Sequence, residues 1–274
     1  MKISIAAIAV PLICILNSAE AEIRVETQNG DLLITTEQSS DWDDFMTEYQ
    51  QGFHFDVTEV DGMVQVRSSN DVTVNGRQSR LFPFPNDDII LSASASTQGG
   101  IHFAVHSLSM SGRSDDLRIS TSGSCHVVNV STGNKSHSDL RINASGSVEV
   151  KQVWVQRDMR IDSSYNFDME LTGVGDLSFI SCRGDATFVN NWMGGNFSLY
   201  FGGLSNIATF SEYLQIDGNT YIQLAGGSDF VEIDLSPFST FGSAWLEGGS
   251  GTDTVYQNAL FFTAGNTKSI EYFK

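Results

Sequence analysis

The sequence Asp116-Leu117-Arg118-Ile119 recurs as Asp139-Leu140-Arg141-Ile142 and again as Asp158-Met159-Arg160-Ile161. Looser copies follow at Asp176-Leu177-Ser178-Phe179, Asn196-Phe197-Ser198-Leu199 and Tyr213-Leu214-Gln215-Ile216. The first apolar residues of these six phrases are 23, 19, 18, 20 and 17 residues apart. A period of about twenty residues is typical of solenoids, in which each repeat buries its apolar face only against its neighbours.

A second series of short apolar runs lies between these phrases, so an apolar pair returns twice in every repeat. Its members are Val128/Val130, Val148/Val150, Met169/Leu171, Phe188, Ile207 and Ile222/Leu224. Strand alternation places Leu117 and Ile119 inside and Arg118 outside. The sequence therefore predicts an all-β fold, a right-handed parallel β-solenoid over residues 89–256 with about 19–20 residues and two strands per coil. An inward stack should comprise Leu117, Leu140, Met159, Leu177, Phe197 and Leu214.

A β-sandwich is the alternative, because short strands at this spacing also describe that fold. Asp217-Gly218 could turn a hairpin between residues 214–216 and 221–224. Elsewhere between residues 116 and 234, tight hairpin signals are scarce. A sandwich also gives no reason for the Asp-Leu-Arg-Ile phrase to recur, so the solenoid is favoured.

The regions on either side of the repeats have a different character. Residues 22–88 predict a hairpin-rich N-terminal cap, because Asn29-Gly30, Asp61-Gly62 and Asn75-Gly76 favour tight turns with positive φ. Within it, Ser40–Gln51 fits either a short helix or a strand. Residues 257–274 predict a C-terminal cap, to which Phe261, Phe262, Tyr272 and Phe273 would contribute.

Residues 1–21 predict a signal peptide, with Lys2 as the charged start, Ile3–Leu16 as the apolar run and Ala19-Glu20-Ala21 as the cleavage pattern. The apolar run is too short to span a bilayer. We therefore expect a secreted or cell-surface protein with no membrane span. Its formal net charge of −18 argues against nucleic acid as a partner.

Two cysteines, Cys125 and Cys182, follow the signal segment. With coils of about nineteen residues they lie about three coils apart, roughly 14 Å at 4.8 Å per coil. A disulfide needs Cα atoms within about 7 Å of each other. We expect two buried or semi-buried thiols rather than a bridge.

One segment has the pattern of a calcium-binding nonapeptide. Gly248-Gly249-Ser250-Gly251-Thr252-Asp253-Thr254-Val255 matches G-G-x-G-x-D-x-U, in which glycine carbonyls and the Asp253 carboxylate face the ion and Val255 faces the core. Gly226-Gly227-Ser228-Asp229 is a partial copy 22 residues earlier.

On these residues the chain resembles the hemolysin-type (RTX) calcium-binding repeat proteins and related secreted bacterial β-solenoids. The match is good over eight residues and faint over residues 223–256. The resemblance implies an ion held between turns of successive repeats, and hence a weak Ca²⁺ site at Gly248, Gly249, Gly251, Asp253 and Asp229. A glycine-rich turn without an ion is the alternative.

Two other features have both a functional and a structural interpretation. The Asp and Arg residues of the repeated phrase should form parallel rows, either a stripe for acidic glycans or a solvated charge ladder. The aromatic residues of the C-terminal third favour core and cap packing over sugar-stacking platforms. These are Trp192, Tyr200, Tyr213, Tyr221, Phe238, Phe241 and Trp245.

The sequence contains no H-E-x-x-H, G-x-S-x-G or G-x-x-x-x-G-K motif and no Cys/His zinc spacing. The adjacent carboxylates Asp87-Asp88 lie in a loop flanked by prolines. The sequence therefore predicts a non-catalytic structural or adhesion protein, whose partner would be a glycan or cell-surface matrix. A polysaccharide lyase or hydrolase of the β-helix type is the alternative.

Overall fold

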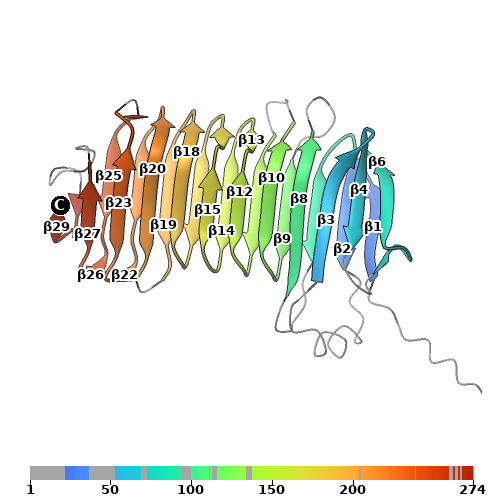
Figure 1. The fold of residues 1–274 in the computed structure, drawn as a ribbon, viewed down its shortest axis with the longest axis horizontal. Helices are drawn as coiled ribbons and strands as arrows, with labels where there is room; N and C mark the ends of the chain where they lie inside the picture. The colour runs from blue at the N-terminus through green and yellow to red at the C-terminus, as the bar shows by residue number, and fades with distance from the viewer. Residues whose placement is uncertain are drawn as a thin grey trace, which may run out of the picture.

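A computed structural model describes residues 22–36, 53–68, 73–93, 100–110, 112, 116–133, 138–203, 205–237, 239–258, 262, 265 and 267–273. Over these residues the protein is all-β, contains no helix and forms an elongated right-handed β-solenoid (Figure 1). The predictions for residues 1–21 and for Ser40–Gln51 lie outside the described residues.

Two large sheets form the long sides of the solenoid. The first, sheet A, has 12 strands within the described residues. In spatial order they are β28 (Thr267–Lys268), β25 (Ala244–Glu247), β21 (Thr220–Gln223), β19 (Phe197–Phe201), β17 (Ser178–Cys182), β14 (Met159–Ser163), β11 (Leu140–Ala144), β9 (Leu117–Thr121), β7 (Ile89–Ala93), β2 (Asp31–Thr36), β1 (Glu22–Gln28) and β5 (Thr73–Val74).

The second, sheet B, has 15 strands in the same part of the chain. Its main path is β29 (Tyr272–Phe273), β27 (Thr254–Gln257), β23 (Phe230–Leu235), β20 (Ile207–Ile216), β18 (Ala186–Met193), β15 (Phe167–Glu170), β12 (Val148–Lys151), β10 (Cys125–Ser131), β8 (Ile101–Ser109), β3 (Phe53–Val60), β4 (Met63–Ser68) and β6 (Ser79–Pro83). The short strands β13 (Trp154–Val155), β16 (Gly173–Val174) and β24 (Thr240–Phe241) pair beside it.

Strands of successive coils pair in parallel, which confirms the solenoid over the sandwich. In sheet A, Leu117 pairs with Leu140, and Leu140 with Met159. Parallel pairing already begins where β2 meets β7 and β3 meets β8. The segment around Asp217-Gly218 makes no hairpin, because β20 and β21 lie in different sheets.

The predicted hairpins of the N-terminal region are present. Strands β1 and β2 pair antiparallel across Asn29-Gly30, and β3 and β4 across Asp61-Gly62. Both residues of each turn have positive φ, as the two-residue turn requires. The first parallel coil of the solenoid therefore follows directly from antiparallel pairs.

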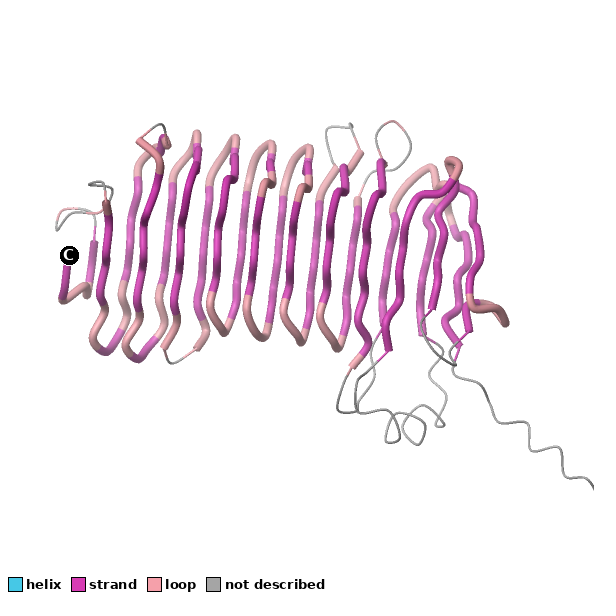
Figure 2. Tube along the Cα trace, in the orientation of Figure 1, coloured by secondary structure: helices cyan, strands magenta, loops and turns pink. Residues whose placement is uncertain are grey.

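One corner of six consecutive coils is made by a residue in the left-handed conformation. Between φ +49° and +65°, these residues occupy equivalent places on six consecutive coils: Ser107, Asn129, Gln152, Leu171, Asn190 and Glu212. A single such residue bends a strand sharply. The bends are visible as kinks along one long edge of the tube in Figure 2.

The core lies between the inner faces of the two sheets, and the predicted inward stack is correct for Leu117, Leu140, Met159 and Phe197, all fully buried. It is wrong for two members. Leu177 is 39% exposed, because Ser178 pairs with Met159 and takes the inward place. Leu214 is buried but belongs to sheet B, where it pairs with Asn191. Sheet A continues instead from Phe197 to Thr220.

Both cysteines are free and buried, as expected. They lie in different sheets, Cys125 in β10 and Cys182 in β17. At the C-terminal end, Phe262 is buried, whereas Tyr272 and Phe273 are exposed.

Candidate functional site

The glycine turn Gly248–Val255 lies directly beside its partial copy. Strand β22 (Gly226–Gly227) pairs in parallel with β26 (Ser250–Gly251) at the turn from sheet A to sheet B. Gly249 and Gly251 have φ of +93° and +130°, and a Cβ on Gly251 would overlap the Gly227 carbonyl. Only glycine fits there, because the two turns stack backbone on backbone.

Asp253 and Asp229 occupy equivalent positions after these turns and are both buried, at 0% and 2% exposure. Asp253 Oδ1 accepts the Asp229 backbone N–H at 3.0 Å, and Asp229 Oδ1 accepts the Asn206 N–H at 2.7 Å. The second carboxylate oxygen of each, Oδ2, has no hydrogen-bond partner among the described residues. A buried oxygen without a partner is costly unless a cation or water satisfies it.

Two oxygens converge on the Cα of Gly248. A Cβ built there would overlap both Asp253 Oδ2 and the Ser269 carbonyl oxygen. Burial raises the pKa of the Asp253 carboxyl above its usual value, and the negative charge of Asp229 adds to the rise. Burial likewise raises the pKa of Asp229. Calcium prefers six to eight oxygen ligands, and the two unpartnered Oδ2 atoms are oxygens of the kind that it binds.

A second column of aspartates lies at the start of successive strands of sheet A, and we call it the Asp ladder. It comprises Asp31, Asp88, Asp116, Asp139 and Asp158, one on each of five successive coils. Each carboxylate accepts the backbone N–H of its counterpart in the next coil, from Asp88 N–H on Asp31 at 3.1 Å to Leu177 N–H on Asp158 at 3.2 Å. The ladder thus satisfies backbone donors between coils.

The sequence showed only three members of this ladder. Asp31-Leu32 and Asp88-Ile89 carry the same signal, an aspartate directly before an inward apolar residue. The predicted solvated row is wrong for Asp116 and Asp139, which are buried. These carboxylates are buried because each one points along the solenoid axis and accepts a backbone N–H of the next coil.

The arginines beside the ladder are neutralised by it. Arg118 contacts Asp116 at 2.8 Å and Asp88 at 2.9 Å, and Arg141 contacts Asp139 at 2.9 Å. Burial alone would raise the pKa of Asp139, yet hydrogen bonds from Arg157 and Arg141 hold that pKa below its usual value. The arginine row therefore offers no excess positive charge to an anionic glycan.

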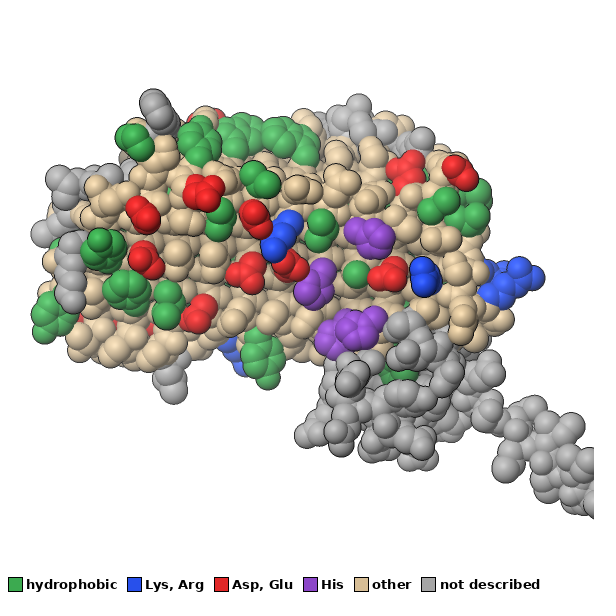
Figure 3. Space-filling model, in the orientation of Figure 1, with side chains coloured by type: hydrophobic (Ala, Val, Ile, Leu, Met, Phe, Trp, Pro, Cys, Tyr) green, Lys and Arg blue, Asp and Glu red, His purple; other side chains and the backbone are tan. Residues whose placement is uncertain are grey.

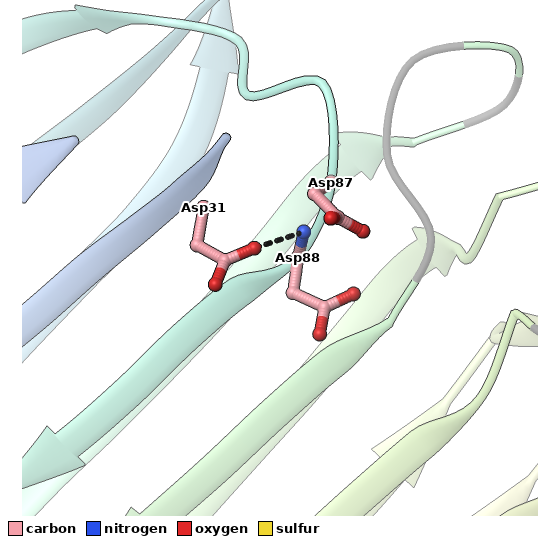
Figure 4. Close-up of side chains that lie close together, drawn as sticks. All are labelled: Asp31, Asp87 and Asp88. Carbon is pink, nitrogen blue, oxygen red and sulfur yellow. Dashed lines mark hydrogen bonds between the residues drawn. The ribbon is translucent and has the colours of Figure 1, made fainter. Parts of the chain in front are cut away.

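Asp31, Asp87 and Asp88 form an acidic cluster whose ligand atoms lie within 4.8 Å of one another (Figure 4). Burial raises the pKa of Asp88. Its carboxylate nevertheless has partners, the Asp116 N–H and Arg118. Asp31 and Asp88 of this cluster are therefore the first two members of the Asp ladder.

The outer face of sheet A changes from arginine to aromatic along the solenoid. We call it the Arg–aromatic face; its residues are Arg118, Arg141, Arg160, Phe179, Tyr200, Tyr221 and Trp245. All are in register except Tyr200, which lies two residues beyond the in-register Ser198. Arg160 lies 4.9 Å from the centroid of Phe179, whose ring stacks on Tyr200 at 5.1 Å. Tyr200 contacts Tyr221 at 5.6 Å, and the Tyr221 hydroxyl reaches Glu247 at 3.1 Å.

This arrangement corrects the expected core placement of several aromatic residues. Trp192, Tyr200 and Tyr221 are partly exposed on outer surfaces, and Trp245 is exposed. A shallow hollow of about 370 Å³ lies over the arginine end, bordered by Arg118, Arg141 and Arg160. The face thus presents a shallow hollow, paired charges and aromatic rings on successive coils along the solenoid axis.

Thiol chemistry is not available at this face. Burial raises the pKa of Cys182 to about 12, with a further contribution from Asp185, and burial also raises that of Cys125. Both sulfurs remain protonated thiols at neutral pH, and a thiol is a poor nucleophile.

Comparison with protein-family models, curated proteins and solved structures found no match to this chain. Among the residues that the structure describes, no helix is long and apolar enough to cross a membrane.

Proposed function

We propose that this protein is a secreted or cell-surface, non-catalytic solenoid of the structural or adhesion type, which binds a glycan along the Arg–aromatic face. The observation that carries the proposal is the change from arginine to aromatic side chains along one outer face of successive coils. Ser198 takes the in-register place between Phe179 and Tyr221, and the ring of Tyr200, two residues along, stacks on Phe179 there. A glycan lying along the axis would meet an arginine or an aromatic ring on each of these coils. The signal segment expected at residues 1–21 supports an extracellular location.

The chemistry of the face favours a glycan over a simple polyanion. The exposed pair Arg160–Asp162 presents donors and acceptors together, which suits sugar hydroxyls. Rings such as Tyr221 and Trp245 offer apolar surface to the C–H face of a sugar. The carboxylates Asp116 and Asp139 already hold backbone and arginine donors, so they serve the fold rather than acid–base chemistry.

The test is binding of the full mature chain to a panel of neutral and acidic polysaccharides, by calorimetry with and without calcium. Tyr221→Ala and Arg141→Ala should each weaken binding, by about tenfold for the tyrosine. Thr209→Ala, a small outward residue on sheet B and outside this face, is the matched control. Absence of binding to every polysaccharide would overturn the proposal. Reproducible turnover, abolished by one carboxylate substitution, would instead favour the lyase or hydrolase.

We also propose a weak calcium site at the glycine turn, held by Asp253, Asp229 and backbone carbonyls of Gly248, Gly249 and Gly251. The unpartnered Oδ2 atoms of the two buried aspartates support it. Affinity should lie in the extracellular range, on the order of 10⁻⁴–10⁻³ M. About 10 mM calcium would then stabilise the fold by roughly 1.5–3 kcal/mol.

Thermal melts of the wild type and Asp253→Asn, with calcium or matched magnesium, test this site. The wild type should gain stability with calcium, and the variant should not. If calcium raised the melting temperature of both proteins equally, the site would be ruled out and screening of the −18 charge would explain the shift.

A further inference from the structure

A pair of tryptophans is stacked at the corner of the solenoid opposite the glycine turn. Trp154 pairs with Gly173, and Gly173 with Trp192, so the two rings belong to coils that are not adjacent. Such positions lie roughly 10 Å apart, twice the spacing of neighbouring strands. The ring centroids are nevertheless only 5.2 Å apart, with an angle of 3° between the planes.

Gly173 makes this stack possible. A Cβ at that position would overlap the Trp154 ring, so the ring occupies the place of the missing side chain. Trp154 therefore leans toward the C-terminal end of the solenoid and away from the coil before it. Trp192 covers one face of its ring, and the indole is still 47% exposed.

A hollow of about 410 Å³ lies on the other side of Trp154. The residues in register with Trp154 on the two preceding coils are Ser131 and Ser109, whose small side chains leave the space open. We call this space the Trp154 hollow. Its volume is within the range of small-ligand sites, roughly 300–1,000 Å³. Hydrophobic side chains gather along the same long edge of the molecule in Figure 3.

The polar side chains that line the hollow are hydroxyls and amides without charge: Ser107, Ser109, Asn129, Ser131 and Gln152. Ser107, Asn129 and Gln152 are the left-handed corner residues of three successive coils, so the bend of each strand presents them at this edge. One aromatic face with a rim of neutral donors and acceptors matches a pyranose ring, which has apolar C–H faces and equatorial hydroxyls.

We propose that the Trp154 hollow binds one sugar unit of a neutral glycan, stacked on Trp154 as the next ring of the Trp192–Trp154 stack. The site is separate from the Arg–aromatic face, since it lies on the corner beyond sheet B. The inference deepens the proposed glycan binding by adding a subsite and a ligand class. The uncharged lining favours neutral over anionic sugars.

The experiment measures binding of the full mature chain to a linear β-glucan, a galactomannan and a xylan, with alginate as the anionic comparison. Trp154→Ala removes the platform, and Ser131→Phe fills the hollow while leaving Trp154 in place. Each should weaken binding of the preferred neutral polysaccharide by about tenfold or more. Tyr165→Ala, an exposed ring in the turn between β14 and β15 and outside both proposed surfaces, is the matched aromatic control and should leave the subsite intact. Circular dichroism and thermal melts of each variant establish that it is folded.

The two proposals fail in different ways. If Trp154→Ala binds every neutral polysaccharide as tightly as the wild type, the hollow is not a sugar subsite. Binding that is then lost in Tyr221→Ala would still support the Arg–aromatic face. Loss of binding in Trp154→Ala but not in Ser131→Phe would also contradict the hollow, because the ligand would not occupy the place in front of Trp154.

Discussion

At the residue scale, two buried aspartates have the same side chain and opposite electrostatic surroundings. Asp139 accepts hydrogen bonds from Arg157 and Arg141, at 2.6 and 2.9 Å to one oxygen. Asp253 has no cationic partner among the described residues and one unpartnered oxygen. Replacing the aspartate with asparagine should therefore change the free energy of unfolding in opposite directions at the two positions.

We predict that Asp139→Asn lowers the free energy of unfolding by about 1–2 kcal/mol, since charge-assisted hydrogen bonds to partly solvated arginines are lost. Asp253→Asn should be neutral or stabilising without calcium, because a buried charge disappears while Oδ1 can still accept the Asp229 N–H. Urea denaturation at pH 7 with a chelator measures both. Two changes of the same sign would contradict this account of the sites.

The direction of each pKa shift predicts how the stability contributions of Asp253 and Asp139 change with pH. Because the pKa of Asp253 is raised in the folded state, the folded protein takes up this proton before the unfolded chain does. The destabilisation caused by the buried charge of Asp253 is therefore present above its folded-state pKa and disappears as pH falls through that pKa. For Asp139 the folded pKa is lowered, so its stabilisation is present above the unfolded pKa and is lost as pH falls.

We therefore expect the stability difference between Asp253→Asn and the wild type to shrink when pH is lowered from 7 toward 4. The difference for Asp139→Asn should shrink only at lower pH, near and below the unfolded pKa of about 4. Urea denaturation across this range gives both profiles. A difference for Asp253→Asn that does not change with pH would rule out titration of this carboxyl as its cause.

At the scale of one strand and its neighbours, the Asp ladder ends where Leu177 takes the ladder position. Leu177 N–H still donates to Asp158, but the leucine offers no acceptor to the following coil. Asn196, in the next coil, resumes the pattern by accepting the Asn219 N–H at 2.8 Å. Leu177 is also exposed, so its replacement removes little buried apolar surface.

We predict that Leu177→Asn stabilises the protein by about 0.5–1 kcal/mol, and that Asn196→Leu destabilises it by a similar amount. The two variants exchange the same side chains at equivalent positions on adjacent coils, so each controls for the other. Changes in the urea midpoint at constant slope report both. Equal signs for the two would show that the ladder position contributes nothing by hydrogen bonding.

The same element shows how far the sequence predicts the structure. Alternation and phase placed Leu117, Ile119 and Arg118 correctly, because a parallel ladder repeats its inward positions. The phase was wrong at Leu177 by one residue, since letters resembling the repeated phrase do not determine pairing register. Ser178 is a polar residue buried at a position that apolar residues occupy in neighbouring coils, so its residue type did not indicate that it points inward.

The stacking of the two glycine turns was predictable because their spacing equals one coil. The Trp154 hollow was not, because it depends on three residues from separate coils. The Trp192–Trp154 stack exists only when Gly173 is in register between them, and the left-handed corner determines that register. A side chain that leans across a neighbouring coil leaves no pattern in the sequence around it.

At the scale of the whole molecule, the described strands of each coil pair only with strands of the coils on either side, and the Trp154–Trp192 stack is a contact that reaches across one coil. The coil Ser178–Asn196 is followed by one with nearly the same inward residues. In sheet B, Ala186 pairs with Ala208 and Phe188 with Phe210. In sheet A, Ile180 pairs with Leu199. Deletion of Ser178–Asn196 would therefore bring an equivalent coil into contact with the one before it.

We predict that this one-coil deletion folds cooperatively, with a smaller urea slope and a lower free energy of unfolding than the full chain, as nearest-neighbour coupling requires. Deletion of Ser178–Asp185 is the matched control. It removes only the sheet A half of the same coil, leaves β14 and β19 without their shared neighbour, and should abolish the cooperative transition. The one-coil deletion also removes Trp192 and with it the support of Trp154, so binding of neutral glycan should weaken even though the fold survives. A one-coil variant that unfolds as completely as the half-coil variant would show that the solenoid depends on contacts beyond adjacent coils.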